Sequence, residues 1–508
     1  MVPESGDCHI GEDLIVSESI PFRRFPNDRL RAATRPTSTW EDAMTKRIKK
    51  QSGQQRQRKV SKVLPLVNPN AAGIDVGASE HYVAVPPDRD EQAVRRFGAF
   101  TEDLHALAQW LLECGVKAVA MESTGVYWIP LYQILGDYGL EVKLVNARHV
   151  KHVPGRKSDV QDCQWLQQLE SFGLLSGSFR PEAKICILRS YMRQREMLIR
   201  SASRHVQQMQ KALTEMNIKL HHVISDLVGV TGLTIVRAII DGERDRLKLA
   251  AMKDRRIKSD EATIAKALEG DYRGEHLFAL RQALELYDYY QQKVAECDTE
   301  ILKEMKTLET RADASAPPAP KGKRKSRSHH NPFSFDGRAE LYRILGVDLT
   351  RIDGLNEGTV QLILSELGLD LCQKWPTEAQ FTSWLGLCPN NEISGGKVLR
   401  RGTRKVINRV ANALRMCAQS LLNSKSALGA YARRMRAKRD SRIAITATAH
   451  KLARLIYRML TYGQEYVDIG QEQYEERFKA SILKSLQRKA RQLGYQLIVS
   501  QPLPTVVP

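Results

Sequence analysis

Ala72-Gly-Ile-Asp75-Val-Gly77 opens the stretch that decides the fold of this chain, which continues to about Phe172. It is an apolar run with one carboxylate in its middle and glycines on both sides. A second apolar run, Ala118-Val-Ala-Met-Glu122, ends on a carboxylate. The stretch closes with Gly155-Arg-Lys-Ser-Asp159-Val-Gln-Asp162, a turn-prone lead into a helix with two further acids. Each acid lies in or at the end of an apolar run, or at the start of a helix. We therefore expect these acids to be the candidate functional residues.

The periodicity of residues 71–175 predicts an α/β domain. Strands are expected at Ile74–Val76, His81–Val85, Ala93–Phe100, Val119–Met121 and Val142–Val145. Helices are expected from Thr101, as N-cap, to Cys114, over about residues 129–138, and from Ser158 or Asp159 to about Phe172. A hairpin followed by alternating strands and helices is the order of an RNase H-like sheet.

Beyond residue 180 the pattern is helical. The stretches Leu188–Asn217 and Leu277–Leu308 predict two amphipathic helices, either an antiparallel or coiled-coil pair or a single extended surface helix. A Pro-rich and basic segment follows, and then more helices, so the fold class is α/β plus all-α. The expected division is a disordered basic arm (1–65), the α/β domain (66–180), a helical coiled-coil region (181–311), a basic linker (312–335), a helical C-terminal domain (336–465) and a helical tail (466–508).

Charge is the unusual feature of the composition. The 508 residues include 78 Lys and Arg but 58 Asp and Glu, which gives a net charge of +20. A surplus of this size favours a polyanionic partner bound through phosphate contacts, and the alternative is a basic but inert surface.

The cysteines and the apolar runs indicate the compartment. Eight cysteines lie far apart without a C-x-x-C pair, which argues against a zinc site or a disulfide scaffold. The sequence contains no run of about 18 apolar residues, so no membrane span is predicted. We therefore expect a soluble cytoplasmic protein without a membrane partner.

The four acids favour a metal site. Asp75 in mid-strand is costly unless it is paired or metal-bound, and Glu122 ends a strand at the edge where α/β sheets place ligands. Asp159 and Asp162, three residues apart, share one helix face. Four converging carboxylates need cations, and Mg²⁺ or Mn²⁺ in a two-metal phosphoryl-transfer site fits them.

The same acids are open to two alternatives. Asp159 could cap its helix while Glu122 and Asp162 are surface acids. The run Gly73-Ile-Asp75-Val-Gly77 also fits the first phosphate loop of actin-like kinases, although that motif does not account for Asp159 and Asp162.

A second cluster surrounds Ser394, which precedes two glycines. An accessible serine beside cations can attack a phosphate that those cations stabilise, or it can belong to a turn that only binds phosphate. The neighbouring cations are Lys397, Arg400, Arg401 and Arg404.

These motifs resemble a family of bacterial insertion-sequence transposases. Gly73-Ile-Asp75-Val-Gly77, Met121-Glu122-Ser-Thr-Gly-Val-Tyr-Trp128 and Lys157-Ser-Asp159-Val-Gln-Asp162 are similar to the motifs of the DEDD transposases, the bridge-RNA-guided recombinases. The run from Leu385-Gly-Leu-Cys-Pro389 through Ser394-Gly-Gly-Lys397 is similar to the C-terminal domain of that family.

The resemblance implies a RuvC-like N-terminal domain in which Asp75, Glu122, Asp159 and Asp162 bind Mg²⁺. Ser394 matches the catalytic serine, which attacks a DNA phosphate. The implied partners are double-stranded DNA at the element ends and target, a structured guide RNA, and further copies in a dimer or tetramer. Arg156, Lys157, Lys397, Arg400, Arg401 and Arg404 are expected phosphate contacts.

Two rival functions remain open at this point. A metal-dependent, structure-specific nuclease of the Holliday-junction resolvase kind would need the four acids and a water nucleophile. A nucleic-acid-binding protein with a degenerate site would need neither the acids nor Ser394.

Overall fold

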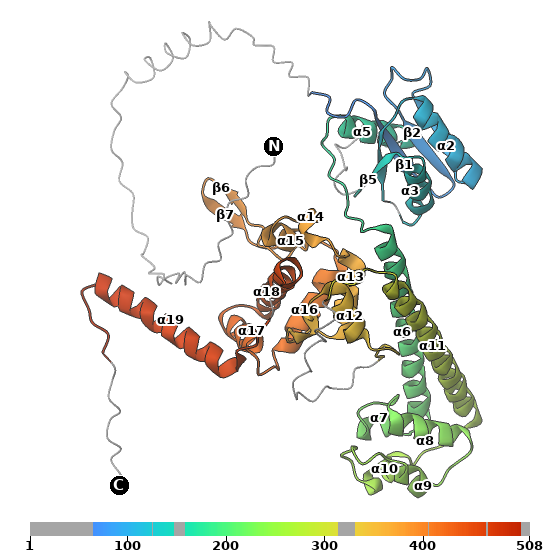
Figure 1. Ribbon diagram of the computed structural model, residues 1–508. Coiled ribbons are helices and arrows are strands. Elements are labelled where there is room, and N and C mark those ends of the chain that lie inside the picture. The colour runs from blue at the N-terminus through green and yellow to red at the C-terminus, as the bar shows by residue number, and fades with distance from the viewer. Residues whose placement is uncertain are drawn as a thin grey trace, which may run out of the picture. The chain divides into compact units, whose positions relative to one another are not determined.

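The computed structural model describes residues 65–123, 125–146, 158–312, 331–404, 406–463 and 466–498. Nearly all of the predicted basic arm, most of the linker, and the expected contacts Arg156 and Lys157 lie outside these residues. The described residues up to Arg180 form one compact unit, and those from Pro181 onward form another (Figure 1). No helix in these ranges is long and apolar enough to cross a membrane.

The first unit is built on a five-stranded sheet. Strand β1 pairs antiparallel with β2 and parallel with β4; β3 extends the antiparallel side, and β5 the parallel side. This mixed sheet confirms the predicted RNase H-like fold. The order is β3-β2-β1-β4-β5, with β1 at Ala71–Val76, β2 at Glu80–Ala84, β3 at Val94–Gly98, β4 at Ala118–Glu122 and β5 at Glu141–Val145.

Helices cover both faces of the sheet. Helices α2 (Thr101–Glu113) and α3 (Trp128–Asp137) pack with the alternate β1 residues Ile74 and Val76 in one hydrophobic core. Helix α5 (Asp159–Ser171) packs on the other face, where Leu166 meets Ala120 of β4. The side-chain alternation of β1 and β4 therefore sorts their residues between the two layers.

The predicted cap of α2 is wrong by one residue. Thr101 is the first helical residue, and Phe100 occupies the N-cap position. Its side chain cannot accept a hydrogen bond, but its backbone N–H donates to the Asp103 carboxylate at 3.3 Å. The acid three residues into the helix thus makes half of a capping box without a capping hydroxyl.

The second unit begins with the two expected long helices, α6 (Ala183–Glu215) and α11 (Gly274–Lys306). They run antiparallel, since Arg195 in the first half of α6 pairs with Asp298 in the second half of α11. The Arg195 Nε to Asp298 Oδ1 distance is 2.5 Å, and both side chains are buried. Between the long helices lie α7 (Leu220–Val223), α8 (Val230–Ile240), α9 (Arg246–Ala251) and α10 (Glu261–Ala267).

The remainder of the second unit is largely helical, as predicted. Its departure from the helical pattern, within the described ranges, is a hairpin of β6 (Glu392–Ser394) and β7 (Lys397–Arg400). The helical elements are α12 (Gly337–Leu345), a 3₁₀ turn at Leu349–Arg351, α13 (Glu357–Leu367), α14 (Leu371–Lys374), α15 (Glu378–Trp384), α16 (Arg409–Leu421), α17 (Ala427–Lys438), α18 (Ser441–Tyr462) and α19 (Gly470–Gln492).

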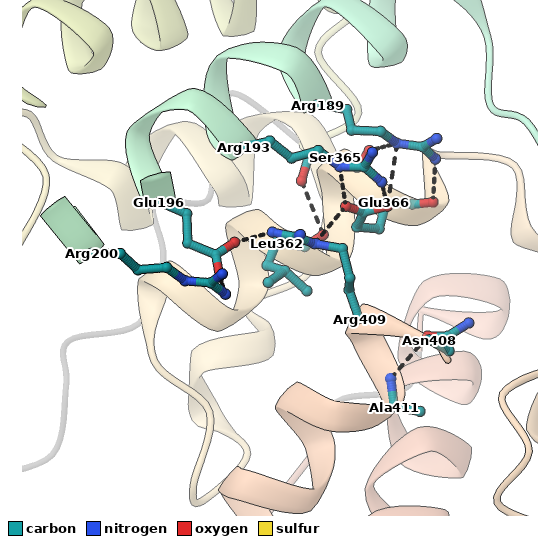
Figure 2. Close-up of polar contacts among 10 residues, drawn as sticks. All are labelled: Arg189, Arg193, Glu196, Arg200, Leu362, Ser365, Glu366, Asn408, Arg409 and Ala411. Carbon is teal, nitrogen blue, oxygen red and sulfur yellow. Dashed lines mark hydrogen bonds and ion pairs between the residues drawn. The ribbon is translucent and has the colours of Figure 1, made fainter. Parts of the chain in front are cut away.

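A network of ion pairs joins α6, α13 and α16 (Figure 2). Glu366 of α13 accepts two hydrogen bonds from Arg193 of α6, at 3.1 and 2.9 Å. Arg409, the first residue of α16, pairs with Glu366 at 3.2 Å and also with Glu196 of α6. Burial, and then the charge of Arg193, lowers the pKa of Arg409. The start of α16, shortly after the hairpin, is thereby fixed on α6.

Candidate functional site

Asp75 and Glu122 lie side by side at one edge of the sheet. The parallel register pairs Gly73 with Ala120 and Ile74 with Met121, so the next pair along the strands is Asp75 with Glu122. Both acids are half-buried, and Glu122 is the last residue of β4, as predicted. Because side chains alternate along a strand, Asp75 shares the α5 face with Gly73, and Glu122 shares it with Ala120.

Helix α5 crosses this face in contact with the backbone of β1. A Cβ placed on Gly73 would lie 2.3 Å from the Cys163 carbonyl oxygen and 2.3 Å from the Gln167 amide nitrogen. Gln167 Nε2 also donates to the Ala71 carbonyl at 3.4 Å. The residue numbers of α5 rise as those of β1 fall, so the helix is antiparallel to the strand. Its N-terminal turn therefore lies toward the Asp75 end of β1.

The predicted acids Asp159 and Asp162 are both in this first turn of α5. Ser158 is the N-cap and accepts a hydrogen bond from the Gln161 N–H at 3.3 Å, which confirms the predicted helix start. Asp159 is exposed and Asp162 is half-buried. Acids in a first turn also stabilise the helix through its dipole, so these two have a structural role in addition to the predicted chemical one.

The thiol of Cys163 lies near acids from both β1 and α5. Its pKa is raised to about 12, mainly by burial and in smaller part by the negative charges of Asp75 and Asp162. The thiol donates a hydrogen bond to the Val160 carbonyl oxygen at 3.1 Å. The buried Cys163 thiol is thus affected by the charge of one carboxylate on β1 and of another on α5. Neither Cys163 nor the contact at Gly73 was predicted from the sequence, although a glycine inside a strand signals close backbone approach.

The structure brings these acids to one edge without assembling them as metal ligands. In the part of the chain that is described, no three His, Cys, Asp or Glu side chains form a group that could hold a metal ion. The donor set nevertheless suits a hard divalent cation, because Mg²⁺ and Mn²⁺ prefer carboxylate oxygens. A metal site formed by all four acids remains a prediction.

Ser394 ends β6 and pairs with Lys397 across a two-residue turn. The turn residues Gly395 and Gly396 have φ angles of 54° and 77°, a left-handed conformation that favours glycine. Every residue of the hairpin is exposed. At its base the Asn390 N–H donates to the Gly402 carbonyl at 2.6 Å. The fold therefore presents Ser394 beside an accessible turn. Any residue other than glycine at positions 395 and 396 would be strained.

The cations predicted around Ser394 differ in their surroundings. Lys397 and Arg401 are exposed, and Arg400 forms an exposed ion pair with Glu392 at 3.5 Å. Arg404 donates to the Ser383 carbonyl of α15 at 2.6 Å and so fixes the irregular segment that follows the hairpin. Phosphate contacts by these four side chains stay a prediction.

Two family models match the chain, and both describe transposases. The IS110-type DEDD transposase model matches residues 72–218, which contain the four acids. The model of the IS116/IS110/IS902 transposase family matches residues 348–433, which contain Ser394. A comparison with curated proteins finds no match. With an RNase H-like sheet in the first matched segment and mainly helices in the second, the chain belongs to the IS110 family of insertion-sequence transposases, which are DNA-binding and DNA-processing enzymes.

Proposed function

We propose that this transposase cuts and rejoins DNA strands with Ser394 as the nucleophile and the four acids as a metal-binding platform. The observation that carries the proposal is the path of α5 across β1. It gathers Asp75, Glu122 and the first turn of α5 at one edge of the sheet. That edge is where sheets of this kind commonly bind their ligands.

Asp75, Glu122, Asp159 and Asp162 would hold Mg²⁺ or Mn²⁺. When bound, the ions would neutralise the scissile phosphate and stabilise the negative charge that develops on it. The chain supplies the rest of the platform. The strand pairing holds Asp75 beside Glu122, and the Gly73 contact sets the distance between α5 and the sheet. Such fixed positioning lets the acids act without rearrangement at the moment of reaction.

Ser394 would attack the phosphorus of one DNA strand. The bond from its Oγ to phosphorus forms, and the phosphorus–oxygen bond to one deoxyribose breaks. The serine proton passes to solvent, and the leaving oxygen takes up a proton. The phosphodiester bond energy is kept in the phosphoserine link, so attack by a new DNA hydroxyl can rejoin the strands and release the serine. Exposed Lys397 and Arg401 would hold the phosphate in place through charge-assisted hydrogen bonds.

The proposed partners are duplex DNA at the element ends and target, a structured guide RNA and further copies of the chain. The net charge of +20 supports polyanion binding. RNA guidance rests on the family resemblance, and sequencing of co-purified RNA tests it. A single defined RNA would support guidance, and random fragments would contradict it.

A second candidate is a metal-dependent nuclease that uses water. It is favoured by one observation, namely that the four acids belong to the unit up to Arg180, whereas Ser394 belongs to the other. Substitution separates the two candidates. Ser394→Ala should abolish strand cleavage if the serine attacks, and should retain it if water attacks.

The matched control is Ser441→Ala, which removes an exposed serine at the start of α18 that also lies among arginines. It should cleave like the wild type. Loss of cleavage in Asp75→Ala, with an unchanged fold by circular dichroism, would exclude a protein that only binds nucleic acid.

A further inference from the structure

The second half of α19 is strongly basic and does not belong to any core. From Arg477 to Ile498 the chain contains no Asp or Glu. None of the residues of α19 is buried. This segment also follows residue 433, where the second family match ends. Six cations lie in it: Arg477, Lys479, Lys484, Arg488, Lys489 and Arg491.

The first half of α19 is anchored to α17. The guanidinium of Arg434 lies over the ring of Phe478 at 3.9 Å and over that of Tyr474 at 5.3 Å. Arg433 donates to the Gln471 side chain at 2.8 Å. Figure 1 shows α19 beginning beside α17. Beyond Phe478, within the described residues, no hydrogen bond, ion pair or ring contact ties the helix to another element. The helix is therefore held at one end.

Four of the six cations share one face. Arg477, Lys484, Arg488 and Arg491 are spaced by seven, four and three residues, which are the spacings of one side of an α-helix. All four are exposed, and the described residues offer none of them an ion-pair partner. At about 1.5 Å per residue this basic face is roughly 21 Å long. We refer to these four residues as the α19 basic face.

We propose that the α19 basic face binds the sugar-phosphate backbone of duplex DNA. The inference takes from the proposed function that duplex DNA is the substrate. Cations without acidic partners release counterions from DNA without first breaking an ion pair. A helix anchored by Arg434 holds its cations at fixed spacing, which reduces the entropy lost on binding. These contacts add affinity that does not depend on base sequence.

The opposite side of the helix favours DNA over a lipid surface or a second copy. Ile482, Leu483, Leu486 and Leu493 lie there, but two lysines share their face. Lys479 is four residues from Leu483, and Lys489 is three residues from Leu486 and four from Leu493. Phe478, the aromatic residue of this segment within the helix, already contacts Arg434. A helix that inserts into a membrane interface, or pairs with another helix, needs a continuous apolar stripe, which Lys489 interrupts and Lys479 limits at its N-terminal end.

Salt dependence of DNA binding tests the proposal on the full-length chain. The test variant is Lys484→Gln/Arg488→Gln, and the control is Lys479→Gln/Lys489→Gln, which removes the same charge from other faces. Glutamine keeps the helix propensity, and none of these residues is buried, so both proteins should fold normally. For a duplex of unrelated sequence, the slope of log affinity against log salt should fall by about 2 in the test variant, since each phosphate contact contributes about 0.9. The control should keep the wild-type slope.

Three results would overturn the proposal. An unchanged slope in the test variant would exclude contact, and equal losses in both variants would exclude an oriented face. Weaker binding to phosphatidylserine vesicles, or to an RNA hairpin, with normal duplex binding would assign the face to that ligand instead. Recovery of the Ser394–DNA link is a separate readout. If wild type forms the link and the slopes do not differ, this inference fails alone; if the slopes differ and no link forms, the proposed function fails alone.

Discussion

Gly73 of β1 lies directly against the backbone of Cys163 in α5. A methyl group on Gly73 would come within 2.3 Å of the Cys163 carbonyl oxygen, closer than real Cβ atoms approach any neighbour. The absence of a side chain at this position lets the helix rest on the strand. The contact thereby sets how far the Asp162 carboxylate, one residue before Cys163, lies from the Asp75 carboxylate.

Gly73→Ala should push α5 away from β1. We expect it to lower the free energy of unfolding by about 1 to 3 kcal/mol, the usual effect of forcing an extra methyl group into a packed core. Strand cleavage should fall as well, because the acids on α5 move relative to those on the sheet. Urea denaturation and a cleavage assay measure the two effects.

Gly136→Ala is the matched control for that substitution. Gly136 lies in α3 of the same unit, and a Cβ there would meet no atom within 4 Å. Alanine in a helix is favoured over glycine by about 0.5 to 1 kcal/mol, so this variant should be slightly stabilised. If both variants lost equal stability, the close contact at Gly73 would not be the cause.

The sequence was enough to predict the sheet, because β1 and β4 are short apolar runs with clear turn residues on both sides. It was also enough to place the helix start at Ser158 or Asp159, and the structure makes Ser158 the N-cap residue. The path of α5 across β1 was not predicted, since it depends on a backbone contact between residues 90 positions apart, Gly73 and Cys163.

The hairpin around Ser394 was missed for a different reason. Glu392–Ser394 and Lys397–Arg400 are exposed on both faces, so they lack the alternation of apolar and polar residues that marks a half-buried strand. The signal that was present is the Gly395-Gly396 pair, because two consecutive glycines suit the two-residue turn of a hairpin.

Alkaline stability should depend on Cys163. Its folded pKa is about 12 against an ordinary value of 9.0, so between these pH values the thiol stays protonated in the folded state and ionises when the chain unfolds. The folded state then binds more protons, and stability falls as pH rises through this window. Urea denaturation at pH 8 and pH 10 should show a smaller decline for Cys163→Ala than for wild type.

Cys372→Ala serves as the control for the alkaline decline, because Cys372 is exposed. It should show the wild-type dependence on pH. Equal declines in wild type and Cys163→Ala would mean that the Cys163 thiol ionises in the folded protein.

Glu366→Gln should destabilise the junction of α6, α13 and α16. The Glu366 side chain is only 12% exposed, and the charge it supplies to Arg193 and Arg409 would be lost. Removing one partner of a buried ion pair costs about 3 to 5 kcal/mol, and solvent around the partly exposed Arg193 and Arg409 lowers this cost. Asp288→Asn, which removes an exposed pair with Arg237, should change the free energy of unfolding by less than about 1 kcal/mol. Similar effects of the two substitutions would show that the junction is not a stabilising network.

Mg²⁺ should raise the melting temperature of the wild type, because a ligand that binds the folded state stabilises it. Asp75→Asn should lose this rise, and a chelator should abolish it in the wild type. Asp137→Asn, which changes an exposed acid at the end of α3, should keep it. A full Mg²⁺-dependent rise in Asp75→Asn would remove Asp75 from the proposed metal-binding platform.

The phosphoserine link at Ser394 is the central claim, and its recovery is the most direct test. Wild-type protein would be incubated with Mg²⁺ and a duplex containing an element end, then denatured, digested and examined by mass spectrometry. We predict a nucleotide covalently attached to the peptide that carries Ser394, present with Ser441→Ala and absent with Ser394→Ala. Cleaved DNA without any covalent adduct, or equal cleavage by Ser394→Ala, would contradict the proposal and identify water as the nucleophile.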